Sequence, residues 1–326
     1  MITIAGAGVA GLASAYELAK RGAEVILYEA GSSPADNPSS WFAGGMLAPW
    51  CEGEVADPQV VRLGAGAIDW WAQVTPVTRK GTLVLSPPRD RAELDRFARR
   101  TDRHRWVDAD EIAMLEPALE TRFQRGLFFE EEAHLDARRA LMDLSAAVQA
   151  LGVDIRYDTP APDRVDVDCR GMAAAETGGL SGLRSIRGEM AIIEAPEVQI
   201  TRTLRLLHPR IPLYLVPRGQ GVYMIGATMI ESTSWREITV RSLLELLGAA
   251  FALHPALGEA SVIETGVGLR PAFADNMPRL IQAGDTTHVN GMYRHGFLLA
   301  PALAGQLAAQ FFQEGSDECH RERQGV

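Results

Sequence analysis

The chain has few cysteines, and they form no recognisable motif. Cys51, Cys169 and Cys319 are the three cysteines among 326 residues, and they lie far apart with no C-x-x-C spacing. An odd and scattered set of this kind indicates neither a disulfide framework nor a zinc site. We therefore expect a protein of a reducing compartment, the cytoplasm.

Clustered basic residues and long apolar runs are also missing. The formal net charge is −10 and no basic stripe occurs. This argues against nucleic acid or an anionic membrane as a partner, because clustered lysine and arginine are needed to bind their phosphates. No uninterrupted apolar run approaches the roughly 20 residues that a membrane-spanning helix needs. The apolar N-terminus lacks the basic segment of a signal peptide, so none is expected.

Motifs for hydrolysis are absent as well. The seven histidines form no H-E-x-x-H pair, and the residues around Ser181 miss the G-x-S-x-G pattern at its last position. No repeat of about 20–50 residues occurs. With 47% hydrophobic and 23% charged residues, the composition is that of an ordinary globular protein. Metal-dependent and serine-dependent hydrolysis are therefore poor interpretations.

What is present begins at the N-terminus, where residues 1–29 predict a nucleotide-binding β-α-β unit. An apolar strand leads into a turn with Gly6, Gly8 and Gly11, an amphipathic helix follows, and a second strand ends at Glu29. The glycines permit a tight turn, close approach to a diphosphate and close packing of helix on strand, while free N–H groups at the helix start face the anion. Glu29 follows Gly11 by 18 residues, where a carboxylate can accept hydrogen bonds from ribose hydroxyls.

Downstream, alternating helices and strands give way to a run of short strands. The pattern predicts helices over 58–71, 89–103, 137–151, 240–253 and 300–312, and strands over 81–86, 126–129 and 153–157. Asp136 is placed to cap the third of these helices. Between Glu189 and Ile230, short apolar strands separated by proline and glycine turns indicate an antiparallel sheet. The length predicts two domains, because single cores stop growing at about 250–300 residues.

Several separated segments carry a specific resemblance to a known family. They are GAGVAG with Glu29, SSWFAGGMLAP, LYLVP, VYMIGATM, GLRPAFADNMP and NGMYRHGFLLAP. Together they resemble the D-amino acid oxidase family of flavoenzymes, most closely the glycine oxidases of thiamine biosynthesis, over nearly the whole chain. The resemblance implies FAD as the cofactor. It is expected to bind noncovalently, because no cysteine lies between Arg270 and Arg294 to form the covalent link of sarcosine oxidase relatives.

The resemblance also implies an α/β fold with two domains. A discontinuous, Rossmann-like FAD-binding domain would take residues 1–75, 130–185 and 262–315. An inserted substrate domain with a mainly antiparallel β-sheet would take 76–129 and 186–261, and 316–326 would form a flexible tail. The stretch from 157 to 171 is shorter than in relatives, so it yields no assignment for the adenine side of the cofactor.

Four residues match substrate-binding positions of the family. Arg270, in GLRP, matches the arginine that binds the substrate carboxylate, and a guanidinium can do this bidentately where a lysine cannot. Tyr214, in LYLVP, matches a tyrosine whose hydroxyl reaches the same carboxylate. The other two matches are Met229, which would line the pocket, and Arg294, which would lie in the active site. No side chain is expected to act as an acid or base.

The cofactor-binding residues implied by the resemblance fall in three stretches. The backbone from Met292 onward would face the pyrimidine edge of the flavin, where amide donors and the following helix stabilise negative charge. The complete set is Gly6, Gly8, Val9, Ala10, Gly11, Glu29, Ala30, Ser39, Ser40, Gly44, Gly45, Met46, Met292, Tyr293, Arg294, His295, Gly296, Phe297 and Leu298. His295 stands where relatives often have asparagine, and neither it nor the stretch Trp50-Cys51-Glu52 receives a defined role.

The function implied by the resemblance is oxidation of glycine, and of other small amines or D-amino acids, to the imine with O2 reduced to H2O2. The expected chemistry is hydride transfer from the substrate Cα to the flavin, which depends on alignment and desolvation. The imine would pass to a thiazole synthase for thiamine, and the enzyme would be a homo-oligomer. A D-amino acid or sarcosine oxidase and a non-catalytic nucleotide-binding scaffold remain alternatives.

Overall fold

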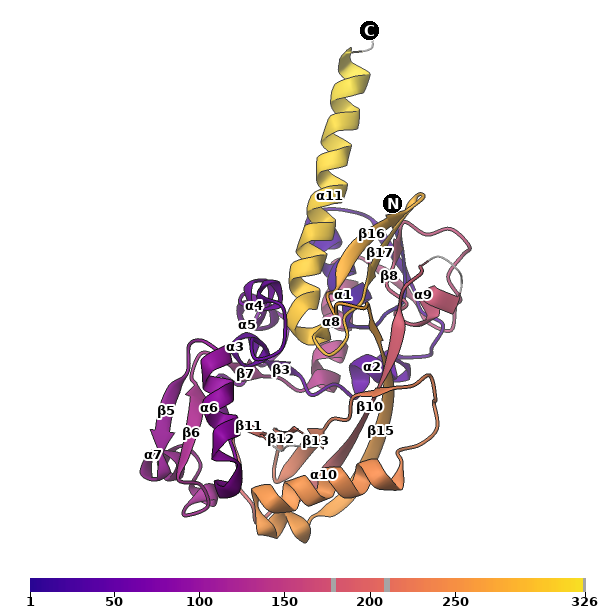
Figure 1. Cartoon of the computed structure of the whole chain (residues 1–326). Helices are drawn as coiled ribbons and strands as arrows, with labels where there is room; N and C mark the ends of the chain where they lie inside the picture. The colour runs from indigo at the N-terminus through magenta and orange to yellow at the C-terminus, as the bar shows by residue number, and fades with distance from the viewer. Residues whose placement is uncertain (177–179, 208–211, 325–326) are drawn as a thin grey trace. The chain divides into compact units, whose positions relative to one another are not determined.

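A computed structural model of the chain describes residues 1–176, 180–207 and 212–324. The chain forms two compact units (Figure 1). Unit 1 comprises Met1–Asn37, Leu141–Arg184 and Pro271–Val326, and unit 2 comprises Pro38–Ala140 and Ser185–Arg270. The division into a cofactor domain and a substrate domain, with the boundaries given above, stays a prediction.

Unit 1 is built on a six-stranded, mostly parallel sheet. Its order is β16-β17-β9-β1-β2-β8, and all neighbours are parallel except the hairpin β16–β17. The strands are β1 (Ile2–Ala5), β2 (Val25–Tyr28), β8 (Asp154–Arg156), β9 (Val167–Asp168), β16 (Arg279–Ala283) and β17 (Thr286–Asn290). The predicted N-terminal β-α-β unit is confirmed, with β1 and β2 parallel on either side of the helix.

The helices of unit 1 flank this sheet. They are α1 (Val9–Lys20), α9 (Ala173–Glu176) and α11 (Gly296–Gln324), and α8 (Ala137–Ala150) crosses the boundary between the units. α1 and α11 pack against each other (Figure 1). Asp136 caps α8 as predicted, because its Oδ1 accepts the N–H of Arg138 at 2.9 Å. The predicted start of the last helix at Ala300 is wrong: α11 begins at Gly296, so Pro301 lies inside the helix instead of at its start.

Unit 2 is built on a nine-stranded sheet that is mainly antiparallel. Its order is β14-β10-β13-β12-β11-β4-β6-β5, with β15 also paired to β10, and β4 and β11 form a parallel pair. The strands are β4 (Thr82–Leu85), β5 (Arg105–Asp108), β6 (Arg125–Phe129), β10 (Arg184–Glu194), β11 (Thr203–Leu206), β12 (Leu213–Gly219), β13 (Val222–Gly226), β14 (Ile230–Glu231) and β15 (Ser261–Ala272). The predicted antiparallel sheet is confirmed.

The remaining elements of unit 2 are short, apart from α6 and α10. They are α2 (Pro38–Trp41), β3 (Met46–Leu47), α3 (Pro49–Glu52), α4 (Pro58–Gly64), α5 (Ala67–Trp71), α6 (Arg91–Arg100), α7 (Ala109–Leu115), β7 (Ala133–His134) and α10 (Val240–Leu253). The single helix predicted over 58–71 is two helices that break at Ala65–Gly66. α10 has the predicted bounds and is capped by the side chain of Thr239, which accepts the N–H of Ser242.

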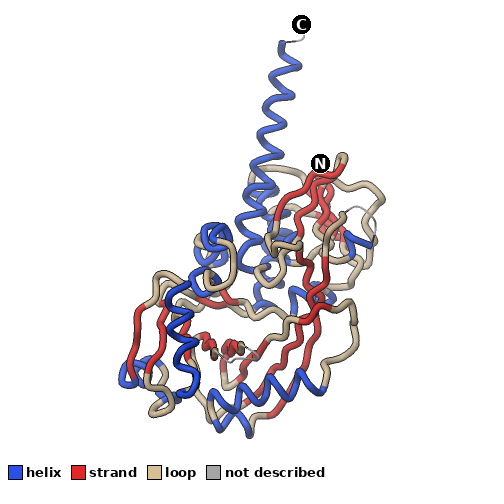
Figure 2. The backbone as a smooth tube through the Cα atoms, in the orientation of Figure 1, coloured by secondary structure: helices blue, strands red, loops and turns tan. Residues whose placement is uncertain are grey.

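In unit 2, α10 runs along the sheet (Figure 2). Leu246, Ala250 and Leu253 of this helix belong to one core with buried residues of the strands, among them Ile193, Leu215 and Ile225. The helix is thus amphipathic, and burial of its apolar stripe stabilises it on the sheet. Among the helices that the structure describes, none combines the length and apolar character needed to cross a membrane.

Candidate functional site

The glycine turn of unit 1 has the close packing that the sequence predicts. Gly6 has a φ of +94°, a conformation that favours glycine. A Cβ on Gly11 would lie 1.8 Å from the carbonyl oxygen of Gly6, so the helix can approach the turn at this distance because Gly11 has no side chain. No side chain caps α1 within the described chain. Its first-turn N–H groups are the donors that a diphosphate would use.

Glu29 lies beside this turn, as its spacing predicts. Its carboxylate is buried and accepts the N–H of Ala7 at 2.6 Å and the N–H of Gly31 at 2.9 Å. Asn37, which the sequence analysis did not single out, donates to the same carboxylate at 3.2 Å. These bonds fix the carboxylate at the end of β2, next to the turn. Its assignment to the ribose stays a prediction.

The segment that precedes α11 is also anchored within unit 1. Tyr293 donates its N–H to the carbonyl of Pro271 at 2.8 Å, and the side chain of Asn290 donates to the carbonyl of Gly171 at 2.9 Å. A Cβ on Gly296 would lie 3.2 Å from the side chain of Val9. Two helix N-termini therefore meet here, because Val9 begins α1 and Gly296 begins α11. Their dipoles together favour negative charge at this place.

Arg270 of unit 2 has a setting that suits an anion. Its Nη1 donates to the carbonyl of Thr228 at 3.1 Å, and its guanidinium lies on Gly188, where a Cβ would be 2.2 Å from Nη2. Arg270 is half-buried, and no carboxylate within the described residues lies at ion-pair distance from it. A half-buried guanidinium in this setting would suit an anionic ligand, and its assignment to the substrate carboxylate stays a prediction.

Tyr214 reaches the same part of unit 2 from another strand. It pairs with Gly226 across β12 and β13, and a Cβ on Gly226 would lie 3.1 Å from its hydroxyl. Arg270 binds the carbonyl of Thr228, two residues farther along. The structure therefore brings both predicted carboxylate-binding residues to the three-residue segment 226–228. Met229 follows directly and is 45% exposed.

The predicted cofactor-binding stretch of unit 2 lies beside these two residues. Ser39 donates its hydroxyl to the carbonyl of Leu269 at 2.8 Å, directly before Arg270. A Cβ on Gly44 would lie 3.0 Å from the ring of Tyr214. The two ends of the stretch thus contact the strands that carry Arg270 and Tyr214. The individual roles of its residues stay predictions.

Sequence analysis missed the arginine that braces this stretch. Arg218, at the end of β12, donates to the carbonyls of Ala43 at 3.3 Å, Gly44 at 3.1 Å and Leu135 at 3.2 Å. Burial lowers the pKa of Arg218 from its ordinary value. The sequence feature that could have pointed to Arg218 is its position in the LYLVPR segment, four residues after Tyr214. It holds the backbone of the glycine pair in place.

The stretch Trp50-Cys51-Glu52 is anchored by a second buried group. Glu132 accepts the N–H of Cys51 at 2.7 Å through its Oε1. Burial raises the pKa of Glu132 to about 7 and raises the pKa of the Cys51 thiol well above its usual range. Burial and a raised pKa both disfavour the reactive thiolate, which favours a structural role for Cys51.

Comparison with known proteins identifies the family. Residues 1–310 match the family described as FAD dependent oxidoreductase, DAO. The chain belongs to this family. It is 53% identical over 320 residues to the putative thiamine biosynthesis oxidoreductase ThiO of Rhizobium etli, covering 96% of this chain and 97% of that protein.

Two more distant relatives also match over nearly the whole of this chain. The glycine oxidase of Geobacillus kaustophilus is 26% identical, with 96% of this chain and 92% of that protein covered, and its crystal structure superposes with a TM-score of 0.79. The bifunctional protein ThiO/ThiG of Nostoc sp. is 26% identical over 97% of this chain. That match spans 53% of the Nostoc protein, so this chain corresponds to about half of it.

FAD is the cofactor of this family member, and the residues present fit it. The evidence in this structure is the turn at Gly6 and Gly11, which side chains would fill, together with the buried Glu29 carboxylate and the two helix N-termini that meet at Val9. These features suit a dinucleotide, whose diphosphate takes backbone donors and whose ribose takes a carboxylate. Unit 1 thus has the parts needed to hold the nucleotide.

Proposed function

We infer that the protein is an FAD-dependent oxidase that converts glycine to its imine, with O2 reduced to H2O2. The observation that carries this is Arg270, a half-buried guanidinium with no acidic partner among the described residues, held between Gly188 and the Thr228 carbonyl. Such a group is suited to the carboxylate of an amino acid. The ThiO of Rhizobium etli and the glycine oxidase of Geobacillus kaustophilus supply the reaction class.

The residues of this chain would bind and align the substrate. Arg270 would hold the carboxylate through two parallel donors, and the hydroxyl of Tyr214 would add a third. When bound, FAD would supply the two-electron acceptor for this oxidation, with O2 as the final acceptor. Alignment of the Cα–H bond and exclusion of water are the contributions expected of the protein, so no side-chain base is required.

The imine would serve the thiazole moiety of thiamine. Two of the relatives support this: one is named for thiamine biosynthesis, and the other joins ThiO and ThiG in a single chain. In this protein, the imine would pass to a thiazole synthase that is a separate chain instead of a fused domain. A homo-oligomer and a cytoplasmic location belong to the same proposal. The free, buried thiols of Cys51 and Cys169 support a reducing compartment.

The experiment is a peroxide assay of the purified holoprotein with glycine, sarcosine and D-alanine. We expect the highest kcat/KM with glycine. A higher kcat/KM with D-alanine or with sarcosine would instead identify the protein as a D-amino acid oxidase or a sarcosine oxidase. Protein that contains flavin but forms no peroxide with any of the three would support the non-catalytic scaffold.

A further inference from the structure

We propose that Glu189 and Thr228 are positioning residues for Arg270, and that they set how tightly the substrate carboxylate is bound. The proposal rests on the proposed function, because it concerns the carboxylate that Arg270 would hold. Neither residue would touch the substrate. They act through the backbone of residue 228, whose carbonyl receives the Arg270 guanidinium.

Thr228 has every polar group committed to one of two partners. Its N–H donates to the carbonyl of Glu189 at 3.2 Å, and its hydroxyl accepts the N–H of Glu189 at 2.9 Å. The same hydroxyl lies 3.2 Å from the Glu189 carboxylate, to which it donates. The remaining group, the carbonyl, accepts from Arg270 at 3.1 Å. Three bonds to Glu189 therefore hold Thr228, the residue whose carbonyl accepts from Arg270, in place.

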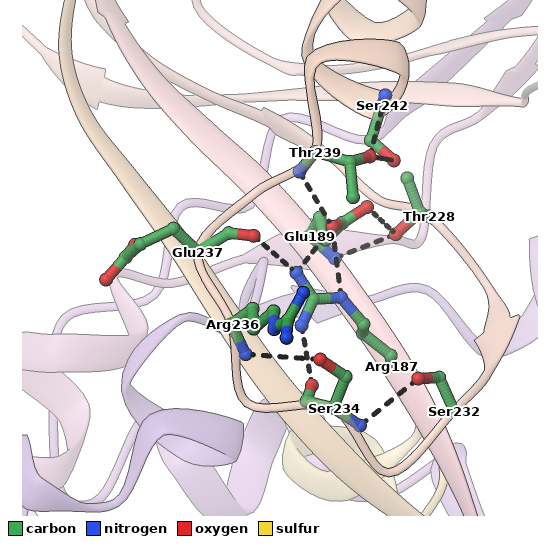
Figure 3. A network of polar contacts seen from close by, with 9 residues as sticks. All are labelled: Arg187, Glu189, Thr228, Ser232, Ser234, Arg236, Glu237, Thr239 and Ser242. Atoms are coloured by element: carbon green, nitrogen blue, oxygen red, sulfur yellow. Dashed lines mark hydrogen bonds and ion pairs between the residues drawn. The ribbon is translucent and has the colours of Figure 1, made fainter.

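Strand β10 separates the two sides of this arrangement. Arg187 and Glu189 alternate with Gly188 along the strand, so their side chains point to the face opposite to that of Gly188. Gly188 contacts the guanidinium of Arg270, while Glu189 lies in a buried network on the other face (Figure 3). The segment at Thr228 links the two faces, since its side chain binds Glu189 and its carbonyl binds Arg270.

The network surrounds the Glu189 carboxylate with hydrogen-bond donors that favour its charged form. Arg187 donates to its Oε1 from Nε at 3.0 Å and from Nη2 at 2.7 Å, and the N–H of Thr239 donates to the same oxygen at 3.1 Å (Figure 3). Burial by itself would raise the pKa of Glu189, but hydrogen bonds from Ser242, Arg187 and Thr239 outweigh burial and lower it. The oxygen that remains, Oε2, is the one that accepts from Thr228.

Arg187 also secures the segment that follows. Its Nη1 donates to the carbonyl of Ser234 at 2.5 Å and its Nη2 to the carbonyl of Glu237 at 2.8 Å. The segment from 232 to 239 is thereby tied to β10 up to the start of α10 (Figure 3). Buried ion pairs with fully satisfied hydrogen bonds rigidify their surroundings more than they stabilise the fold. This is what a positioning role requires.

The test compares two substitutions at position 228 in the holoprotein. Thr228→Val removes the hydroxyl at nearly constant volume, and Thr228→Ser keeps it. The readouts are KM and kcat for glycine, the Kd of glycolate measured by the change in flavin absorption, and Tm. Thr201→Val is the matched control, because the Thr201 hydroxyl donates in the same way to a different buried carboxylate, that of Glu116, at 3.0 Å, and Glu116 pairs with Arg202.

We expect Thr228→Val to raise both the KM for glycine and the Kd of glycolate about tenfold, with kcat changed by less than about threefold. Thr228→Ser should restore both values to near wild type. Thr201→Val should lower Tm and leave Kd unchanged. Should valine not be accommodated, Thr228→Ala needs no added space and must give the same tenfold weakening.

The outcomes separate this proposal from the function on which it rests. Wild-type protein that neither oxidises glycine nor binds glycolate refutes the proposed function. Wild-type binding that Thr228→Val retains in full, or that Thr201→Val loses equally, refutes the positioning role alone.

Discussion

At the scale of single residues, the account depends on one guanidinium and the groups that orient it. Arg270 donates to the Thr228 carbonyl and lies on Gly188, and it has no carboxylate partner in the part of the chain that is described. Two buried ion pairs of unit 2 are complete within the protein: Arg187 with Glu189, and Arg202 with Glu116 at 2.9 Å. The contrast supports the proposal that a ligand supplies the missing charge at Arg270.

Replacing Arg270 tests that role directly. We expect Arg270→Ala to lower kcat/KM for glycine about a hundredfold, equivalent to about 3 kcal/mol, because charge-assisted bidentate hydrogen bonds are lost. Arg270→Lys should fall between wild type and alanine, since lysine keeps the charge without the planar pair of donors. Flavin content measured by absorption should stay at the wild-type level in both variants. Unchanged kinetics in Arg270→Ala would remove the residue from the site.

Glu132 gives the stability of the protein a pH dependence of known sign. Burial raises its pKa from 4.5 to about 7, so the folded state binds a proton more tightly than the unfolded state. Its contribution is favourable below pH 4.5 and is lost as the pH rises to about 7, at a cost of about 3 kcal/mol. Glu132→Gln keeps an oxygen for the N–H of Cys51 but does not titrate.

The measurement is Tm of both proteins between pH 4.5 and 8. Relative to wild type, Glu132→Gln should gain stability steadily as the pH rises and level off above pH 7. His134 also contributes to the pH dependence of stability, with the opposite sign, because burial lowers its pKa to about 4. Its contribution is present in both proteins and therefore cancels in the difference between them. Parallel curves for the two proteins would show that Glu132 does not titrate in this range.

At the scale of elements, the turn between β1 and α1 has no room for a side chain at Gly11. Gly11→Ala would place a Cβ 1.8 Å from the Gly6 carbonyl oxygen, and neither backbone can move without shifting the strand or the helix. We expect this variant to be purified without flavin. The check is the flavin absorption of the purified protein.

Gly248→Ala is the matched control for that substitution. Gly248 lies within α10, and a Cβ there would meet nothing within 4 Å. Alanine should leave flavin content unchanged and stabilise the helix by up to about 1 kcal/mol. A Gly11→Ala protein that kept its full flavin complement would contradict the interpretation of the turn.

The elements also show where sequence reasoning succeeds and where it fails. α10 has the bounds that its residue pattern predicts, because apolar residues recur along it at helical spacing. β9 was missed because it has two residues, Val167–Asp168, and exists through pairing with β1 and β17. The hairpin β16–β17 was missed because β16 is half-exposed and has little apolar alternation. Such strands are determined by tertiary contacts, which local pattern does not contain.

The same distinction applies to the candidate site. Arg270 and Tyr214 were identified because they lie in motifs that resemble a family. Arg218 and Glu189 act on backbone groups distant in sequence, the carbonyls of 43 and 44 and the peptide of 228. Nothing in their own neighbourhood of the sequence indicates those partners, so the folded structure was needed to find them.

At the scale of the whole molecule, the division of labour follows the two units. Unit 1 holds the glycine turn, Glu29 and the paired helix N-termini, which suit a dinucleotide. Unit 2 holds Arg270, Tyr214 and the network around Glu189, which suit recognition of a small carboxylate. Membership of the FAD dependent oxidoreductase family accounts for both sets in one chain.

The most direct test of carboxylate recognition is anaerobic reduction of the wild-type holoprotein by glycine and by glycinamide. Reduction is measured as the decrease in flavin absorption. The two compounds share the amine and the reacting Cα–H bond and differ in the group that Arg270 would bind. Glycine is predicted to reduce the flavin, and glycinamide at the same concentration to leave it oxidised. Equal rates of reduction with both compounds would contradict the account.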